Sequence, residues 1–310
     1  MASSGTAKDL RTIRRVLAVT GFSSESVGGL LQARAIATML GAELHIAHAI
    51  ESISAAAEAA VPGLAETHQR QAHEDLEAFA NAHGVGAGAT LHVVSGEPST
   101  ALLTLHNKIG ADLLVLGRYG KGGLKRGSIG SVAAALVRKN PTPTLVVEPT
   151  HRGAFTRIGV ATAFDDTSWV EIARARTLAQ HFGIGEVVLL HAYELPHGYH
   201  RIMSYEQAIE KLGAVSKERA DQFIKKTDAA GGKVRSVIVE GDAASRLPEL
   251  IAEEKVDLLV MSTHWRTAAA QALLGHTTER VLKRVDCSVW AETCPELVQD
   301  FGDAMKRILG

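Results

Sequence analysis

Short apolar runs alternate with longer mixed stretches along the chain. In the first half, near-continuous apolar runs stand at 16–20, 44–49, 91–95, 112–117 and 144–148. The stretches that we interpret as helices lie between them, at 26–41, 64–83, 100–109 and 130–139. Unbroken apolar runs are typical of strands covered on both faces, as in parallel sheets. Since parallel strands need helical crossovers, the pattern predicts a doubly wound α/β fold with ligands at the carboxyl ends of the strands.

The second half of the chain repeats the first. RRVLAVTGFSSES at 14–26 resembles TRIGVATAFDDTS at 156–168, and GADLLVLG at 110–117 resembles KVDLLVMS at 255–262. The order of such pairs is constant, at an offset of 142 to 145 residues, which predicts a duplicated domain. The sequence therefore predicts four parts: a lead-in at 1–12, domains at 13–149 and 154–293, and an amphipathic helix at 294–310 that packs on a neighbouring sheet or a partner.

Composition narrows the class of protein. The 310 residues are 46% hydrophobic and 22% charged, with a formal net charge of −1, so nothing in the global balance favours nucleic acid or an anionic membrane as a partner. No apolar run approaches the length of a membrane span, and the N-terminus does not resemble a signal peptide. The two cysteines, Cys287 and Cys294, cannot form a disulfide framework and suit a reducing cytosol.

The only concentrated positive charge lies in GRYGKGGLKRGSIGS, at 117–131. Gly117 and Gly120 let the backbone approach a ligand closely, and Gly130 and Ser131 begin a helix whose N–H groups favour an anion. With the charges of Lys121, Lys125 and Arg126, these features indicate a phosphate site. The spacing fits neither a P-loop nor the dinucleotide fingerprint. The alternative is a plain glycine-rich turn before a helix capped by Ser128 or Ser131.

The glycines follow the pattern G-x2-G-x9-G-[ST], and the chain resembles the universal stress protein A family in two tandem copies. The resemblance implies, for each copy, a five-stranded parallel sheet of order 3-2-1-4-5. It also implies a site for ATP, with or without magnesium, or for AMP. Ribose and phosphates would contact Gly117, Gly120, Gly130, Ser131 and Val132. Ala49, after His48, would meet the adenine edge through its backbone.

The first copy departs from the family at the end of its first strand. ATP-binding members usually carry an aspartate there, whereas this chain has Thr20 or Gly21. Loss of a carboxylate acceptor costs on the order of 1–3 kcal/mol. We therefore expect binding to be weak or retuned to another ligand. His48 and its counterpart His191 are expected to be hydrogen-bonded core residues.

The second copy has lost the motif. Ser262 and Trp265 replace the two leading glycines, and His276 replaces Ser131. We predict that this copy does not bind ATP in the family manner. Two roles remain open for it: a packing partner for the first copy, or a changed pocket lined by Trp265, His264, His276 and Tyr193.

No nucleophile, base and acid occur in a catalytic arrangement, so we predict a nucleotide-binding module and not an enzyme. A slow ATPase and a ligand-free interaction scaffold are the alternatives. The resemblance further implies a regulatory role in the stress response, a cytoplasmic location and a homodimer. It also implies an intramolecular pseudo-dimer through the apolar segments 144–148 and 288–292.

Overall fold

Two domains make up the chain. The computed structural model describes residues 13–120, 128–165, 168–228, 231–262 and 276–292. Its internal contacts separate Arg11–Gly153, here called the first domain, from a second domain that begins at Ala154. The predicted lead-in at 1–12 and the predicted helix at 294–310 lie outside the described residues. None of the helices in the described ranges is long and apolar enough to cross a membrane.

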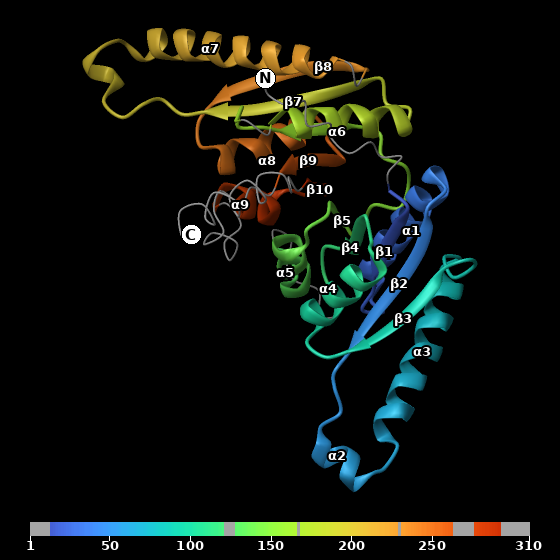
Figure 1. The fold of residues 1–310 in the computed structure, drawn as a ribbon. Coiled ribbons are helices and arrows are strands. Elements are labelled where there is room, and N and C mark those ends of the chain that lie inside the picture. Colours follow the sequence, from blue (N-terminus) through green and yellow to red (C-terminus); the bar gives the residue numbers. More distant parts are fainter. Residues whose placement is uncertain (1–12, 121–127, 166–167, 229–230, 263–275, 293–310) are drawn as a thin grey trace, which may run out of the picture. The chain divides into compact units, whose positions relative to one another are not determined.

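The first domain is a parallel sheet with its helices in the crossovers (Figure 1). In chain order its elements are β1 Arg15–Val19, α1 Ser24–Leu40, β2 Glu43–Ile50, α2 Ala55–Ala60, α3 Leu64–Ala82, β3 Thr90–Ser95, α4 Pro98–Ile109, β4 Leu113–Gly117, α5 Ser131–Lys139 and β5 Thr144–Val147. The strands pair in the order β3-β2-β1-β4-β5. Every residue of the interior strand β4 is buried, as expected for a strand covered on both faces.

The second domain repeats this architecture. Its elements are β6 Ile158–Ala161, α6 Ser168–His181, β7 Glu186–Tyr193, a 3-10 helix at Tyr199–Arg201, α7 Tyr205–Lys226, β8 Lys233–Glu240, α8 Ala243–Glu253, β9 Leu258–Ser262, α9 His276–Arg284 and β10 Ser288–Glu292. The strand order is β8-β7-β6-β9-β10, all parallel. Each domain therefore has the order 3-2-1-4-5, and the predicted fold class is confirmed.

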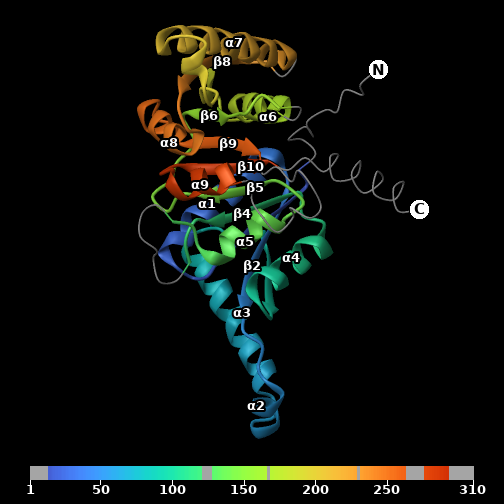
Figure 2. The same ribbon diagram turned by 90° about the vertical axis from the view of Figure 1, so that its left-hand side faces the viewer.

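One element of the first domain was not predicted. Helix α2 follows Ser54, whose side chain accepts a hydrogen bond from Ala57, and none of its residues is buried. It lies far from the sheet, beyond the start of α3 (Figures 1 and 2). Because the alanine-rich segment buries no face, it carries no amphipathic pattern from which a helix could be predicted.

Candidate functional site

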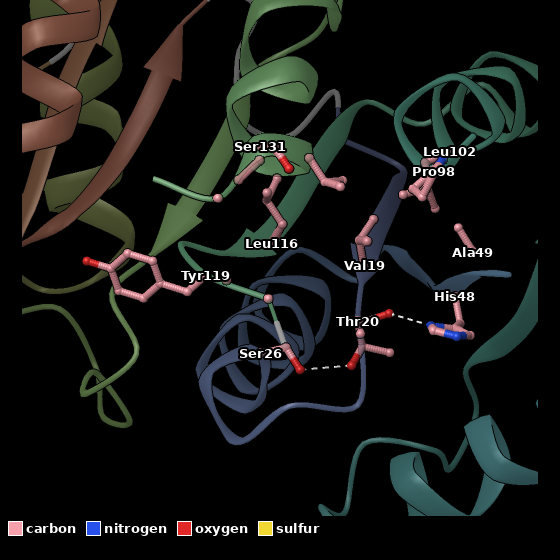
Figure 3. A pocket seen from close by; sticks show the side chains of 16 residues that line it. Val19, Thr20, Ser26, His48, Ala49, Pro98, Leu102, Leu116, Tyr119 and Ser131 are labelled. Carbon is pink, nitrogen blue, oxygen red and sulfur yellow. Dashed lines mark hydrogen bonds between the residues drawn. The ribbon is translucent and has the colours of Figure 1, made fainter. Parts of the chain in front are cut away.

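A pocket opens at the carboxyl ends of β1, β2 and β4 in the first domain. It has a volume of about 480 Å³ and is lined by 16 residues, within the size range of small-molecule sites. Apolar side chains of Val19, Leu102, Leu116 and Pro98 form part of its wall (Figure 3). The pocket lies where open parallel sheets bind their ligands, next to the central strands.

The N-terminus of α5 opens into this pocket. The N-cap is Gly130, which has no side chain to cap the helix, and no acidic residue stands in the first turn. Ala134 donates to the carbonyl of Gly130 at 2.8 Å; the three preceding residues, Ser131, Val132 and Ala133, line the pocket. Their N–H groups come before the first intrahelical bond, so this helix end favours an anion. The alternative of a cap from Ser128 or Ser131 stays a prediction.

The glycines of the motif have different structural roles. A Cβ on Gly117 would lie 2.8 Å from the carbonyl oxygen of Glu25, and one on Gly29 would lie 2.9 Å from the nitrogen of Gly117. Gly117 therefore allows α1 to pack closely against β4, besides lining the pocket. A Cβ on Gly120 would meet no atom of the described residues within 4 Å. The N–H of Gly130 donates to the carbonyl of Arg118 at 2.9 Å, which closes the loop.

The end of β1 presents hydroxyl and imidazole groups. The Thr20 hydroxyl lies 2.9 Å from that of Ser26, and Nδ1 of His48 donates to the carbonyl of Thr20 at 2.8 Å (Figure 3). The ring of Phe22, whose φ is +60°, lies 4.0 Å from that of His48. A Cβ on Gly21 would meet no atom within 4 Å. The described pocket lining contains no carboxylate.

The second domain repeats this arrangement almost unchanged. Nδ1 of His191 donates to the carbonyl of Thr162 at 2.8 Å, and the ring of Phe164, with φ +54°, lies 4.2 Å away. His191 is 9% exposed, and burial lowers the pKa of its imidazole. The histidine is thus hydrogen-bonded in both domains, as predicted, but only His191 is a buried core residue; His48 is half-buried and lines the pocket. Because the arrangement occurs with and without an intact glycine loop, it belongs to the fold.

All the predicted site residues meet at the one pocket: Gly21, Ala49, Gly117, Gly120, Gly130, Ser131 and Val132. Their contact with nucleotide stays a prediction. Lys121, Lys125 and Arg126 lie outside the described residues. Sequence reasoning missed the wall supplied by Pro98 and Leu102, although a proline after Gly96-Glu97 marks the start of a helix at the end of β3. Hydrogen bonds from Thr100 and Ser99 hold the pKa of Glu97, the N-cap of that helix, at about 2.

The second domain holds a buried glutamate where the first has glycine. Counting from the aligned Ser26 and Ser168, Glu171 stands in the place of Gly29. Its Oε1 accepts a hydrogen bond from the N–H of Ser262, the last residue of β9, at 3.0 Å. Glu171 is 3% exposed, and its hydrogen bond leaves the N–H of Ser262 unavailable to a ligand. Trp265 and His264 lie outside the described residues, as does the side chain of His276.

Together these observations define a tandem α/β protein with a pocket at the strand ends of its first domain. The chain belongs to the universal stress protein family, because the model of the Universal stress protein family matches it twice, at residues 12–148 and 154–291. Universal stress protein MJ0531 of Methanocaldococcus jannaschii is 33% identical over 86 residues, which are 28% of this chain and 51% of that protein. Universal stress protein MJ0577 of the same organism is 31% identical over 74 residues, 24% of this chain and 46% of that protein.

The chain thus matches about half the length of these curated relatives. Among solved structures, the functionally unknown protein PA1789 from Pseudomonas aeruginosa PAO1 has a TM-score of 0.66 at 17% identity, over 96% of this chain and 99% of that one. A universal stress protein from Archaeoglobus fulgidus has a TM-score of 0.61 at 14% identity, over 91% and 99%. At these identities the likeness shows the fold.

Proposed function

We propose that the first domain binds an adenine nucleotide, ATP or AMP, in the pocket at the end of β4. The observation that carries the proposal is the N-terminus of α5, which lines the pocket, has a glycine as its N-cap and has no acidic residue in its first turn. Backbone N–H groups at such a terminus suit phosphate oxygens. The apolar wall of Val19, Leu102 and Leu116 suits the face of a base.

Binding without turnover is the activity that this lining supports. Phosphoryl transfer uses carboxylates or similar ligands for magnesium and a group that orients the attacking oxygen. The lining residues that the structure describes include no Asp or Glu. The described residues also contain no group of three or more His, Cys, Asp or Glu side chains placed to hold a metal ion. Magnesium would accompany ATP through its phosphates.

The second domain, in this proposal, binds no ATP and serves as a structural partner. The side chain of Glu171 already accepts a hydrogen bond from the N–H of Ser262. Ser262 and Trp265 stand in place of the two leading glycines of the motif. Family membership supports a regulatory role in the stress response, a cytoplasmic location and a homodimer. The pairing of the two domains and of two chains stays a prediction, which cross-linking and sedimentation would test.

Isothermal titration of the full chain tests the function. We expect ATP or AMP to bind with one equivalent per chain, and adenosine to bind much more weakly because it has no phosphate for the α5 terminus. Inorganic tripolyphosphate separates the phosphate contribution from that of the base. Mass spectrometry of gently purified protein would detect nucleotide retained from the cell. Failure of all adenine nucleotides to bind, or two equivalents per chain, would contradict the proposal.

A further inference from the structure

Arg118 lies between the anion site and the linker that joins the domains. It follows Gly117 in the loop motif, yet its side chain is only 1% exposed and its Nε lies 2.9 Å from Oε2 of Glu148. Its backbone N–H donates to the carbonyl of Val147 at 3.0 Å, and its carbonyl accepts from Gly130 at 2.9 Å. One residue thus contacts the N-cap of α5, the end of β5 and the residue that precedes the linker.

The linker, residues 149–153, packs against α1. The guanidinium of Arg152 donates to the carbonyl of Ser24 at 3.2 Å, and the side chain of Gln32 donates to the carbonyl of Gly153 at 2.5 Å. A Cβ on Gly28 would lie 2.8 Å from the carbonyl oxygen of His151. Only glycine allows the linker backbone to come this close to the helix. The same helix supplies Ser26 to the pocket, so the linker lies against a wall of the site.

The second domain offers an internal comparison. Glu292, at the end of β10, corresponds to Glu148. It is paired with Arg174 of α6, at 2.8 Å from Nε to Oε2, and also accepts from the indole N–H of Trp290. Within the described residues, the acid at the end of the fifth strand is therefore paired in both domains. Its arginine comes from the nucleotide loop only in the domain where the glycine motif is intact.

We propose that the Arg118–Glu148 pair couples the anion site to the linker, so that nucleotide binding and packing of the linker on α1 stabilise each other. The proposal rests on nucleotide binding by the first domain. Arg118 is a positioning residue here, because Glu148 holds its guanidinium. Coupling between two sites is reciprocal: the factor by which nucleotide favours the packed linker equals the factor by which the packed linker favours nucleotide.

Two variants test the coupling in the full chain. Arg118→Met with Glu148→Gln removes the pair without leaving one charge alone. Gly28→Ala keeps both charges and improves helix propensity, but its Cβ displaces the linker backbone from α1. The matched control is Arg174→Met with Glu292→Gln, which removes the corresponding pair in the second domain. The measurements are ATP affinity by titration and amide hydrogen exchange at residues 150–153, with and without ATP.

In the parent protein, ATP is expected to slow exchange in the linker. The Arg118/Glu148 variant is expected to lose this protection and to bind ATP about tenfold more weakly, within the usual range of coupling. Gly28→Ala should weaken ATP binding in the same direction, and the Arg174/Glu292 control should keep parental affinity and protection. The coupling alone is overturned if the parent protein binds ATP without slower exchange in the linker, or if both test variants bind ATP with parental affinity. No nucleotide binding by the parent protein overturns the proposed function as well.

Discussion

Replacement of Gly130 tests the proposed anion site, because a capping side chain and a phosphate would compete for the same backbone N–H groups of α5. Gly130 is the N-cap of α5, with φ −60° and ψ 147°, a conformation that any residue can adopt. Asp at this position would accept hydrogen bonds from the first-turn N–H groups. It would thereby satisfy the groups that we assign to phosphate, and it would bring a negative charge to them.

The structure sets the expected magnitudes. A Cβ at position 130 would lie 3.3 Å from the carbonyl oxygen of Arg118, which is a mildly strained contact. This strain offsets the few tenths of a kcal/mol by which an Asp N-cap stabilises a helix more than a Gly N-cap does. The free energy of unfolding should therefore change by less than about 1 kcal/mol. A phosphate that loses one charge-assisted hydrogen bond loses about 1.5–3 kcal/mol. Repulsion by a carboxylate about 4 Å away adds about 1–4 kcal/mol.

Gly130→Asp should consequently weaken ATP binding more than about 100-fold with little change in stability. Gly130→Asn caps the helix without charge, and we expect a loss of about 10- to 100-fold. Gly130→Ala adds the same Cβ without a cap, and its affinity should stay within about threefold of the parent, on the order of 0.6 kcal/mol. Titration calorimetry measures the affinities and urea unfolding the stabilities. Equal losses in all three variants, or parental affinity in Gly130→Asp, would refute the assignment of phosphate to α5.

Three further changes have defined expected outcomes. A Cβ on Gly21 meets no described atom within 4 Å. Gly21→Asp restores a carboxylate beside the pocket and should tighten ATP binding by about 1–3 kcal/mol. Weaker binding of this variant in a titration would contradict the prediction. Gly117→Ala places its Cβ against the backbone of α1, 2.8 Å from the nearest oxygen, and should cost about 1–3 kcal/mol of stability in urea unfolding, whereas Ser262→Ala at the equivalent position should cost less. Burial lowers the pKa of His191 in the folded state. The unfolded chain therefore binds more protons, and stability should fall as the pH drops below about 6.5; His191→Gln should reduce that slope in unfolding measured from pH 7.5 to 5.

The fold was largely predictable, and the predicted site residues all line one pocket. Continuous apolar runs such as residues 112–117 identify buried parallel strands because both faces of each strand need cover. The role of Gly117 could not be predicted, since its Cβ would meet Glu25, a residue distant in sequence. The partner of Arg118 was hidden for the same reason: a basic residue in a glycine loop suggests phosphate, yet the structure pairs it with Glu148.

The sequence by itself determined that this protein is a duplicated α/β chain with one intact glycine motif. Hydrophobic runs, repeat offset and glycine spacing are local properties, and each constrains the backbone before distant contacts form. Only the tertiary structure decided that α5 begins at the pocket, that Glu171 contacts a strand end in the second domain, and that the linker packs on α1 at Gly28. These features depend on which distant segments come within a few ångströms of each other, and that distance is set by packing.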